Sequence, residues 1–264
     1  MTQAAGTWNG VARQSQVACR RFIALGDGTG DCATEDRAAD ALVAVNDRVA
    51  RYFATLAAVA VDENYSISGG AENLSGAVAQ IPGVNADDVA AVGELATAFA
   101  NLMLQHKRER SMRRLIERGG QPAQRVIAMM RRVAVPSFAG NLDSEAQRID
   151  QALIDTIPDP MKRLGPDRRA WCDSPPRLSS FGRDRTAFLM ALELCRRHRE
   201  VRGDQAAVAA YDASLASAAE ALGQLQSGAA RLGKVETARL LYQRARDLQD
   251  KIDAVRARRT KGDE

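Results

Sequence analysis

The four cysteines are the residues whose type and spacing most clearly permit chemistry. Cys19 and Cys32 flank the glycine-rich stretch GDGTGD, and a proline-rich segment separates Cys172 from Cys195. A tight turn between two antiparallel helices can bring Cys19 and Cys32 within the short Cα separation that a disulfide requires. A second bond would join the proline-rich segment to the helix after it. We therefore predict two local disulfides, which indicate an oxidising compartment such as a bacterial periplasm.

Two other interpretations of the cysteines stay open. Four reduced, partly buried thiols would fit a cytosolic protein. Cys172, Cys195 and His198 could alternatively bind zinc, because Cys195 and His198 are three apart on one helical face. A zinc site usually needs four ligands, and the sequence offers no evident fourth. We predict no metal and no cofactor.

Catalytic motifs are absent from the sequence. It contains none of the patterns GxSxG, GxxxxGK[ST], GxGxxG or HExxH. The only histidines are His106, which we expect to pack half-buried on a helix, and His198, which we expect at the surface among arginines. We predict that the protein is not an enzyme. An unrecognised enzyme would need a deep polar pocket with converging titratable groups.

A basic segment, KRERSMRR, raises the hypothesis of contact with an anionic surface such as phospholipid headgroups or nucleic acid. Acidic residues interleave with the arginines along the chain and aromatics make up only 5% of it, which favours an ordinary solvated helix surface and argues against nucleic acid. Under the anionic-surface hypothesis, the contacts would be Lys107, Arg108, Arg110, Arg113 and Arg114.

The elements that position these residues are predicted to be helices. The chain has 264 residues, of which 45% are hydrophobic and 27% charged, and its net charge is +4. Apolar residues recur at spacings of three and four, and no apolar run is long enough to span a membrane. We predict one all-α domain over 1–264, an elongated antiparallel helical bundle with coiled-coil-like seams.

Two uninterrupted heptad seams carry this prediction. The first consists of Ala38, Leu42, Val45, Val49, Tyr52, Leu56 and Val59. The second consists of Val208, Tyr211, Leu215, Ala218, Leu222, Leu225, Ala229 and Leu232. Because these inward positions are almost all apolar, we expect no converging polar groups inside the protein.

Capping and breaking residues predict the helix boundaries. We expect a first helix from Thr7 to about Leu25, and a second that starts after Cys32 with Thr34 as its cap. We expect Asn85 to cap a long helix that Gly119–Gly120 ends.

The rest of the chain has less regular signals. Pro122 suits the first turn of the next helix, and Pro136 and Gly140 kink it or divide it into two. Five prolines predict an irregular loop over 158–181. A register break beside Gly233 predicts a helical hairpin over about 204–258, with a single stuttered helix as the alternative.

The order of these features resembles uncharacterised proteobacterial exported all-helical proteins described as lipoproteins. The layout consists of the early Cys-to-Cys turn, the helix VNDRVARYFATLAAVAVDEN, a proline-containing middle, and the late helices YDASLASAAEALGQL and RLGKVETARLLYQRARDLQDKI. The resemblance implies a periplasmic protein, anchored to the membrane through an N-terminal lipobox that is removed from or omitted before this sequence.

These observations together predict a function. We expect a non-enzymatic envelope protein that binds protein partners through its helical faces or its 158–181 loop. The alternative is a cytoplasmic helical scaffold, or a protein associated with nucleic acid or another anionic surface.

Overall fold

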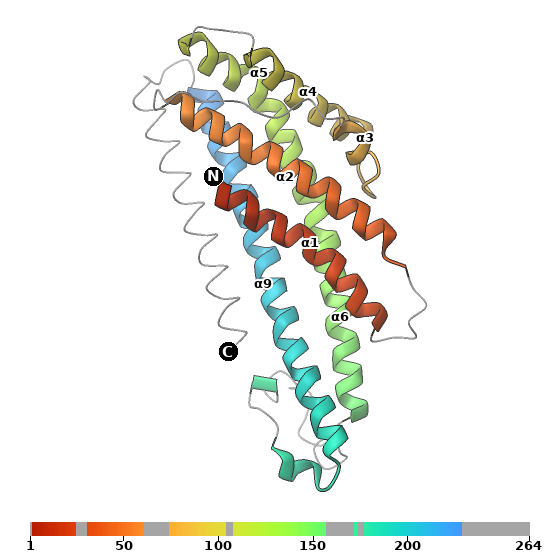
Figure 1. Ribbon diagram of the computed structural model, residues 1–264. Helices are drawn as coiled ribbons and strands as arrows, with labels where there is room; N and C mark the ends of the chain where they lie inside the picture. Colours follow the sequence, from red (N-terminus) through yellow and green to blue (C-terminus); the bar gives the residue numbers. More distant parts are fainter. Residues whose placement is uncertain are drawn as a thin grey trace.

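The computed structural model describes residues 2–24, 31–60, 74–103, 108–156, 172–173 and 177–228, which are almost entirely helical (Figure 1). No strand occurs among these residues. The all-α prediction is therefore confirmed. None of the helices among these residues combines the length and the hydropathy of a membrane span.

Helices α1 (Thr2–Ala24) and α2 (Ala33–Ala60) lie side by side and run antiparallel (Figure 1). Helix α1 begins earlier than the predicted Thr7. The predicted cap of α2 was wrong, because Thr34 lies inside the helix. Instead the Ala33 N–H donates to Asp31 Oδ1 at 2.5 Å. The Asp31 carboxylate therefore accepts from a backbone N–H at the start of α2 that has no partner within the helix.

The short helix α3 (Leu74–Val78) precedes α4 (Ala86–Met103). Asn85 caps α4 as predicted. Its Oδ1 accepts the Asp88 N–H at 2.9 Å, and Asp88 Oδ2 accepts the Asn85 N–H at 3.0 Å. This reciprocal pair is a capping box, which satisfies two N–H groups that the helix leaves without partners.

The predicted end of a helix at Gly119–Gly120 was wrong. Helix α4 ends at Met103, and α5 (Arg108–Met129) runs through both glycines and through Pro122. Both glycines are buried. A Cβ at Gly119 would lie 2.7 Å from Tyr52 Cε2, and one at Gly120 would lie 2.7 Å from Gln226 Nε2. These glycines therefore permit α2 and α9 to approach α5 closely.

Replacing Gly119 with alanine tests this close approach. We expect Gly119→Ala to lower the free energy of unfolding by about 1–2 kcal/mol, because its methyl group would overlap the Tyr52 ring. The matched control is Gly140→Ala in α6, where a Cβ would meet nothing within 4 Å. That change should stabilise the helix by up to about 1 kcal/mol. Urea unfolding of both variants measures the difference, and equal effects would contradict the interpretation.

Helix α5 continues into α6 (Val135–Thr156) through a π-helical turn, η1 (Met130–Ala134). The Val135 N–H bonds to the Met130 carbonyl, five residues earlier. This wider turn immediately precedes Pro136, whose ring would clash with a carbonyl in regular α-helix and which has no N–H to donate. The helix is therefore one continuous run, and Gly140 does not interrupt it.

Helix α9 (Arg185–Gly228) follows a short 3₁₀ turn, η2 (Leu178–Phe181). Its 44 residues give a length of about 66 Å. The first arm of the hairpin predicted over about 204–258 is the end of a longer helix, because α9 is continuous from Arg185. The second arm of the predicted hairpin and most of the predicted 158–181 loop lie outside the described residues.

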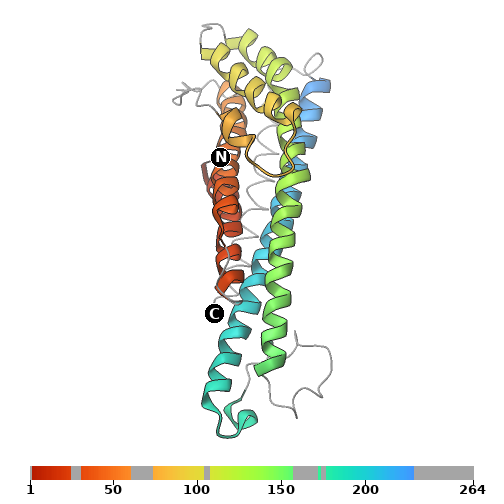
Figure 2. The same cartoon turned by 90° about the vertical axis from the view of Figure 1, so that its right-hand side faces the viewer.

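Helices α6 and α9 pack along each other in opposite directions. Gln205 donates to Asp143 at 2.8 Å, and His198 lies beside Asp150, so numbers rise on one helix as they fall on the other. The two helices extend beyond α1 and α2 to a narrow end, where η2 lies (Figure 2).

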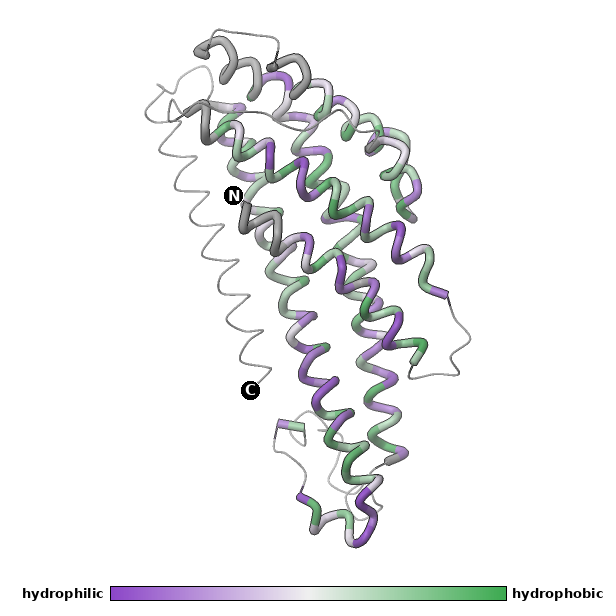
Figure 3. Tube along the Cα trace, viewed as in Figure 1, coloured by the Kyte–Doolittle hydropathy of each residue, from purple (hydrophilic) through white to green (hydrophobic). Residues whose placement is uncertain are grey.

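The predicted seam positions that the structure describes lie in the core, except for Ala38, which is only half-buried. Figure 3 shows apolar and polar residues alternating along each helix, as amphipathic helices require. Side chains of Val59, Ala229 and Leu232 lie outside the described part. The buried seam residues are Leu42, Val45, Val49, Tyr52, Leu56, Val208, Tyr211, Leu215, Ala218, Leu222 and Leu225.

Candidate functional site

Buried polar side chains converge where α1, α6 and α9 meet, contrary to the expected apolar interior. Gln14 Nε2 donates to Asp204 Oδ1 at 2.5 Å. Arg21 Nη1 lies 3.6 Å from Asp204 Oδ2 and 3.7 Å from Glu145 Oε1. One guanidinium thus faces two buried carboxylates. We call Gln14, Arg21, Glu145 and Asp204 the buried polar cluster.

The carboxyl group of Glu145 has an unusual environment within the buried polar cluster. Its side chain is 0% exposed, and no described residue donates a hydrogen bond to either carboxylate oxygen. Burial raises the pKa of Glu145 to about 7, and the negative charges of Asp204 and Glu200 act in the same direction. Arg21 and Arg197 oppose this increase. Glu145 therefore changes its charge near neutral pH.

His198 is buried, contrary to the prediction of a surface position. It is only 4% exposed, and its Nε2 lies 3.7 Å from Asp150 Oδ1. The neighbouring arginines suggested a solvated site, but helical spacing places His198 on the same face as Cys195. That face is covered in the fold, because Cys195 is buried as well.

The spacing of residues along α6 and α9 could have predicted that Glu145 and Asp204 are buried. Asp204 lies three residues after Val201 and four before Val208, both of which are buried. Glu145 sits in the same way between Leu142 and Ile149 on α6. A polar residue at these spacings must share the buried face of its helix.

A second buried network joins α1, α2 and α9. Trp8 Nε1 donates to Ser214 Oγ at 3.0 Å, and the Tyr211 hydroxyl donates to Asn46 Oδ1 at 2.8 Å. The rings of Trp8 and Tyr211 meet edge to face, with centroids 6.1 Å apart. Burial raises the pKa of Tyr211 far above its usual value, so the phenol stays protonated as a donor. This network fixes the helices against one another.

Both predicted cysteine pairs lie at disulfide distance. The sulfur atoms of Cys19 and Cys32 are 2.01 Å apart, and those of Cys172 and Cys195 are 2.06 Å apart. The second pair leaves Cys172 and Cys195 without thiolates for zinc. Among the residues that the structure describes, no group of three or more histidine, cysteine or acidic side chains could hold a metal ion.

The segment around Cys172 is held on α9 by two further contacts. Arg199 Nη1 donates to the Cys172 carbonyl at 2.9 Å. Arg202 forms an ion pair and a hydrogen bond with Asp173. These contacts and the Cys172–Cys195 pair give three attachments between α9 and the preceding segment.

The narrow end of the molecule displays apolar side chains to solvent. Leu189 is 62% exposed, Met190 is 52% and Leu178 is 41%. Among the large apolar side chains that the structure describes, only Val17, at 38%, is comparably exposed. Arg177, Arg183 and Arg185 are exposed beside them. We call η2 and residues 182–190 together with Arg177 the tip.

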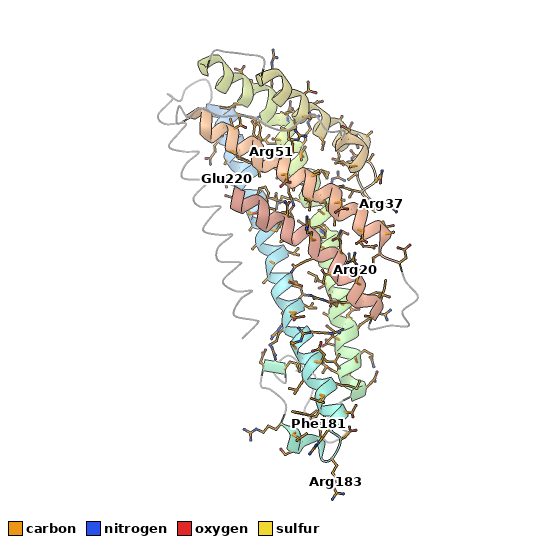
Figure 4. The ribbon with its side chains drawn as sticks, viewed as in Figure 1. Arg20, Arg37, Arg51, Phe181, Arg183 and Glu220 are labelled. Atoms are coloured by element: carbon orange, nitrogen blue, oxygen red, sulfur yellow. A yellow bond between two sulfur atoms is a disulfide. The ribbon has the colours of Figure 1, made fainter. Side chains whose placement is uncertain are left out.

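The tip has an ordered base. Phe181 is buried and packs edge to face on Phe188, with ring centroids 5.6 Å apart. Asp184 Oδ1 accepts the Ala187 N–H at 2.8 Å, which caps the first turn of α9. Figure 4 shows Phe181 and Arg183 at the end of the molecule, with Arg183 extending away from the body.

A cavity of about 280 Å³ lies between α1, the start of α2 and α6. Its size is near the lower limit for a small-molecule site. Glu145 and Asp204 are not among its lining residues, so the cavity does not join the titratable groups of the buried polar cluster. The lining consists of Ala18, Cys19, Phe22, Ile23, Asp31, Glu35, Asn141 and Ser144.

The structure does not describe the side chains of the basic residues predicted to contact an anionic surface. Lys107 lies outside the described residues, as does His106. The side chains of the other four are also outside the described part, although their backbone belongs to α5: Arg108, Arg110, Arg113 and Arg114.

Comparison of the chain with known protein families, with curated proteins and with solved structures gives no match in any of the three. The resemblance to exported helical proteins therefore stays a prediction.

Proposed function

We propose that this protein is a non-enzymatic cell-envelope component that acts by surface contact through its tip. In this proposal an elongated antiparallel bundle, with coiled-coil-like seams, serves as the rigid support of the tip. The observation that carries the proposal is the exposure of Leu178, Leu189 and Met190 together at one end. Several exposed apolar residues at one end of a molecule are typical of an interaction site.

The attachments of the tip support an interaction role. The Cys172–Cys195 pair, the Arg199 contact and the Phe181–Phe188 packing all hold the exposed residues on α9. A surface that is ordered before binding loses less conformational entropy when a partner binds. The tip also includes the end of the 158–181 segment, where the sequence predicts a binding role.

The proposed location rests on the cysteines. Two cysteine pairs at disulfide distance favour an oxidising, extracytoplasmic compartment. A periplasmic protein, anchored through a lipobox, remains our proposal. The alternative, a cytoplasmic scaffold or a nucleic-acid-associated protein, would require these thiols to stay reduced.

Site-specific cross-linking in cells tests the proposed contact. We expect a photoreactive residue at Leu189 to give covalent adducts with another envelope component, because this side chain is the most exposed apolar group of the tip. The matched control is Ala209, an exposed position on the same helix but far from the tip. Adducts are measured by gel shift and mass spectrometry. Equal yields at both positions, or no adduct at Leu189, would contradict the proposal.

A further inference from the structure

We infer that the tip docks on the surface of an anionic phospholipid bilayer. This inference rests on the proposed function and specifies the component that the tip contacts. It depends on three properties of the tip, namely its small apolar area, its excess of arginines and its place at the end of the molecule.

The small apolar area of the tip favours a lipid surface over a folded protein partner. A standard protein–protein interface buries roughly 800 Å² on each partner and needs matching shapes. Leu178, Leu189 and Met190 are three partly exposed side chains, which supply far less apolar area. A bilayer interface requires no matched shape, because each apolar side chain and each cation adds to binding separately.

The charge of the tip complements anionic headgroups. Residues 177–190 contain three arginines and one acid, Asp184. The Asp184 carboxylate accepts the Ala187 N–H and lies at the positive end of the α9 dipole, so part of its charge is offset locally. Arg177, Arg183 and Arg185 are exposed, and a guanidinium binds phosphate oxygens through paired donors.

The arrangement of these groups suits contact with a flat surface. Arg185 and Leu189 are four residues apart on α9, as are Thr186 and Met190, so they share one exposed side of the first two turns. Arg183 extends from the end of the molecule in Figure 4. In a tip docked on a bilayer, the arginines therefore lie at the headgroups. Leu189 and Met190 lie at the boundary between the headgroups and the acyl chains.

Vesicle co-sedimentation of the full chain tests the inference. The probes are vesicles of phosphatidylcholine alone, and vesicles in which about a third of the lipid is phosphatidylglycerol. We expect binding to the anionic vesicles at low salt, several-fold weaker binding at about 0.3 M NaCl, and little binding to neutral vesicles, because the attraction is screened by salt. Absence of binding to anionic vesicles at low salt would overturn the inference.

Matched variants locate the contact. The double variant Arg183→Gln/Arg185→Gln should weaken binding about 25-fold, since each cation near an anionic surface contributes roughly a fivefold factor. Leu189→Ser/Met190→Ser should weaken binding at both salt concentrations. The control Arg13→Gln/Arg37→Gln removes the same charge from exposed positions on α1 and α2 and should change binding less than twofold. An equal loss in the control would show diffuse attraction and overturn the inference.

The two proposals fail in different ways. If Leu189 cross-links to a protein in cells but the chain does not bind anionic vesicles, the interaction role stands and the lipid assignment is wrong. If neither cross-linking nor vesicle binding occurs, both are wrong. Circular dichroism of each variant establishes that the helices are retained.

Discussion

Replacing Cys172 and Cys195 with alanine is expected to lower the free energy of unfolding by about 3 kcal/mol. The bond closes a loop between positions 23 residues apart, and the loss of chain entropy in the unfolded state accounts for about this amount. Both residues are also buried, so alanine leaves small voids that add to the loss. Urea unfolding monitored by circular dichroism measures the change.

Reductant provides the control for the cysteine variant. With dithiothreitol, the free energy of unfolding of the wild-type protein should fall below that of the double variant without reductant. The reason is that reductant opens the Cys19–Cys32 bond as well. The variant should still respond to dithiothreitol through that bond alone, by about 3 kcal/mol over a separation of 13 residues. A wild-type protein whose stability does not change with reductant would contradict the role of both bonds.

Replacing Glu145 with glutamine is expected to stabilise the protein by up to about 3 kcal/mol at pH 8. The folded protein raises the pKa of Glu145 from an ordinary 4.5 to about 7, so ionised Glu145 opposes folding above that pH. The folded state binds more protons than the unfolded state between these values. The contribution of Glu145 to the free energy of unfolding should thus be most favourable below pH 4.5. It should fall as the pH rises from 4.5 to about 7.

The glutamine variant should lack this dependence on pH. Glutamine has the shape of the protonated acid and keeps its volume beside Arg21, so the difference in unfolding free energy should vanish below about pH 5. Glu94→Gln is the matched control, because Glu94 pairs with Arg125 at an exposed site where an ion pair contributes little. A Glu145→Gln variant that is less stable than the wild type at pH 8 would contradict this prediction.

The buried polar cluster gives a physical reason for the alignment of α1, α6 and α9. Sliding one helix past another by a turn would separate Arg21 from Glu145 and Asp204 and leave charges buried without partners, which is costly. The Trp8–Ser214 and Tyr211–Asn46 bonds would break in the same movement. If the helices met only through apolar seams, the same sliding movement would cost less free energy.

Local signals in the sequence were sufficient for much of the fold. The three-and-four spacing of Leu42, Val45 and Val49 identified a buried face, since helical geometry converts spacing directly into position. Asn85 identified a helix start, because its short polar side chain suits a helix cap. The cysteine pairing followed from short separations across turns and needed no knowledge of tertiary structure.

Features that depend on contacts between distant residues were not predictable from the sequence. Gly119 and Gly120 serve close packing, and only the positions of Tyr52 and Gln226 distinguish this from a helix stop. The burial of His198 depends on α6 lying over its face. The tip depends on which ends of α9 and η2 remain uncovered, a property of the whole assembly.

The central claim is that two disulfides hold the helices and the tip of this protein together. Such bonds form in an oxidising compartment. The most direct test is mass spectrometry of the full chain, exported to a bacterial periplasm, denatured and alkylated with iodoacetamide without reductant, both intact and after digestion with a protease. We expect no alkylated cysteine, and peptides that link Cys19 to Cys32 and Cys172 to Cys195. Four alkylated cysteines, or links between the two pairs, would contradict the account.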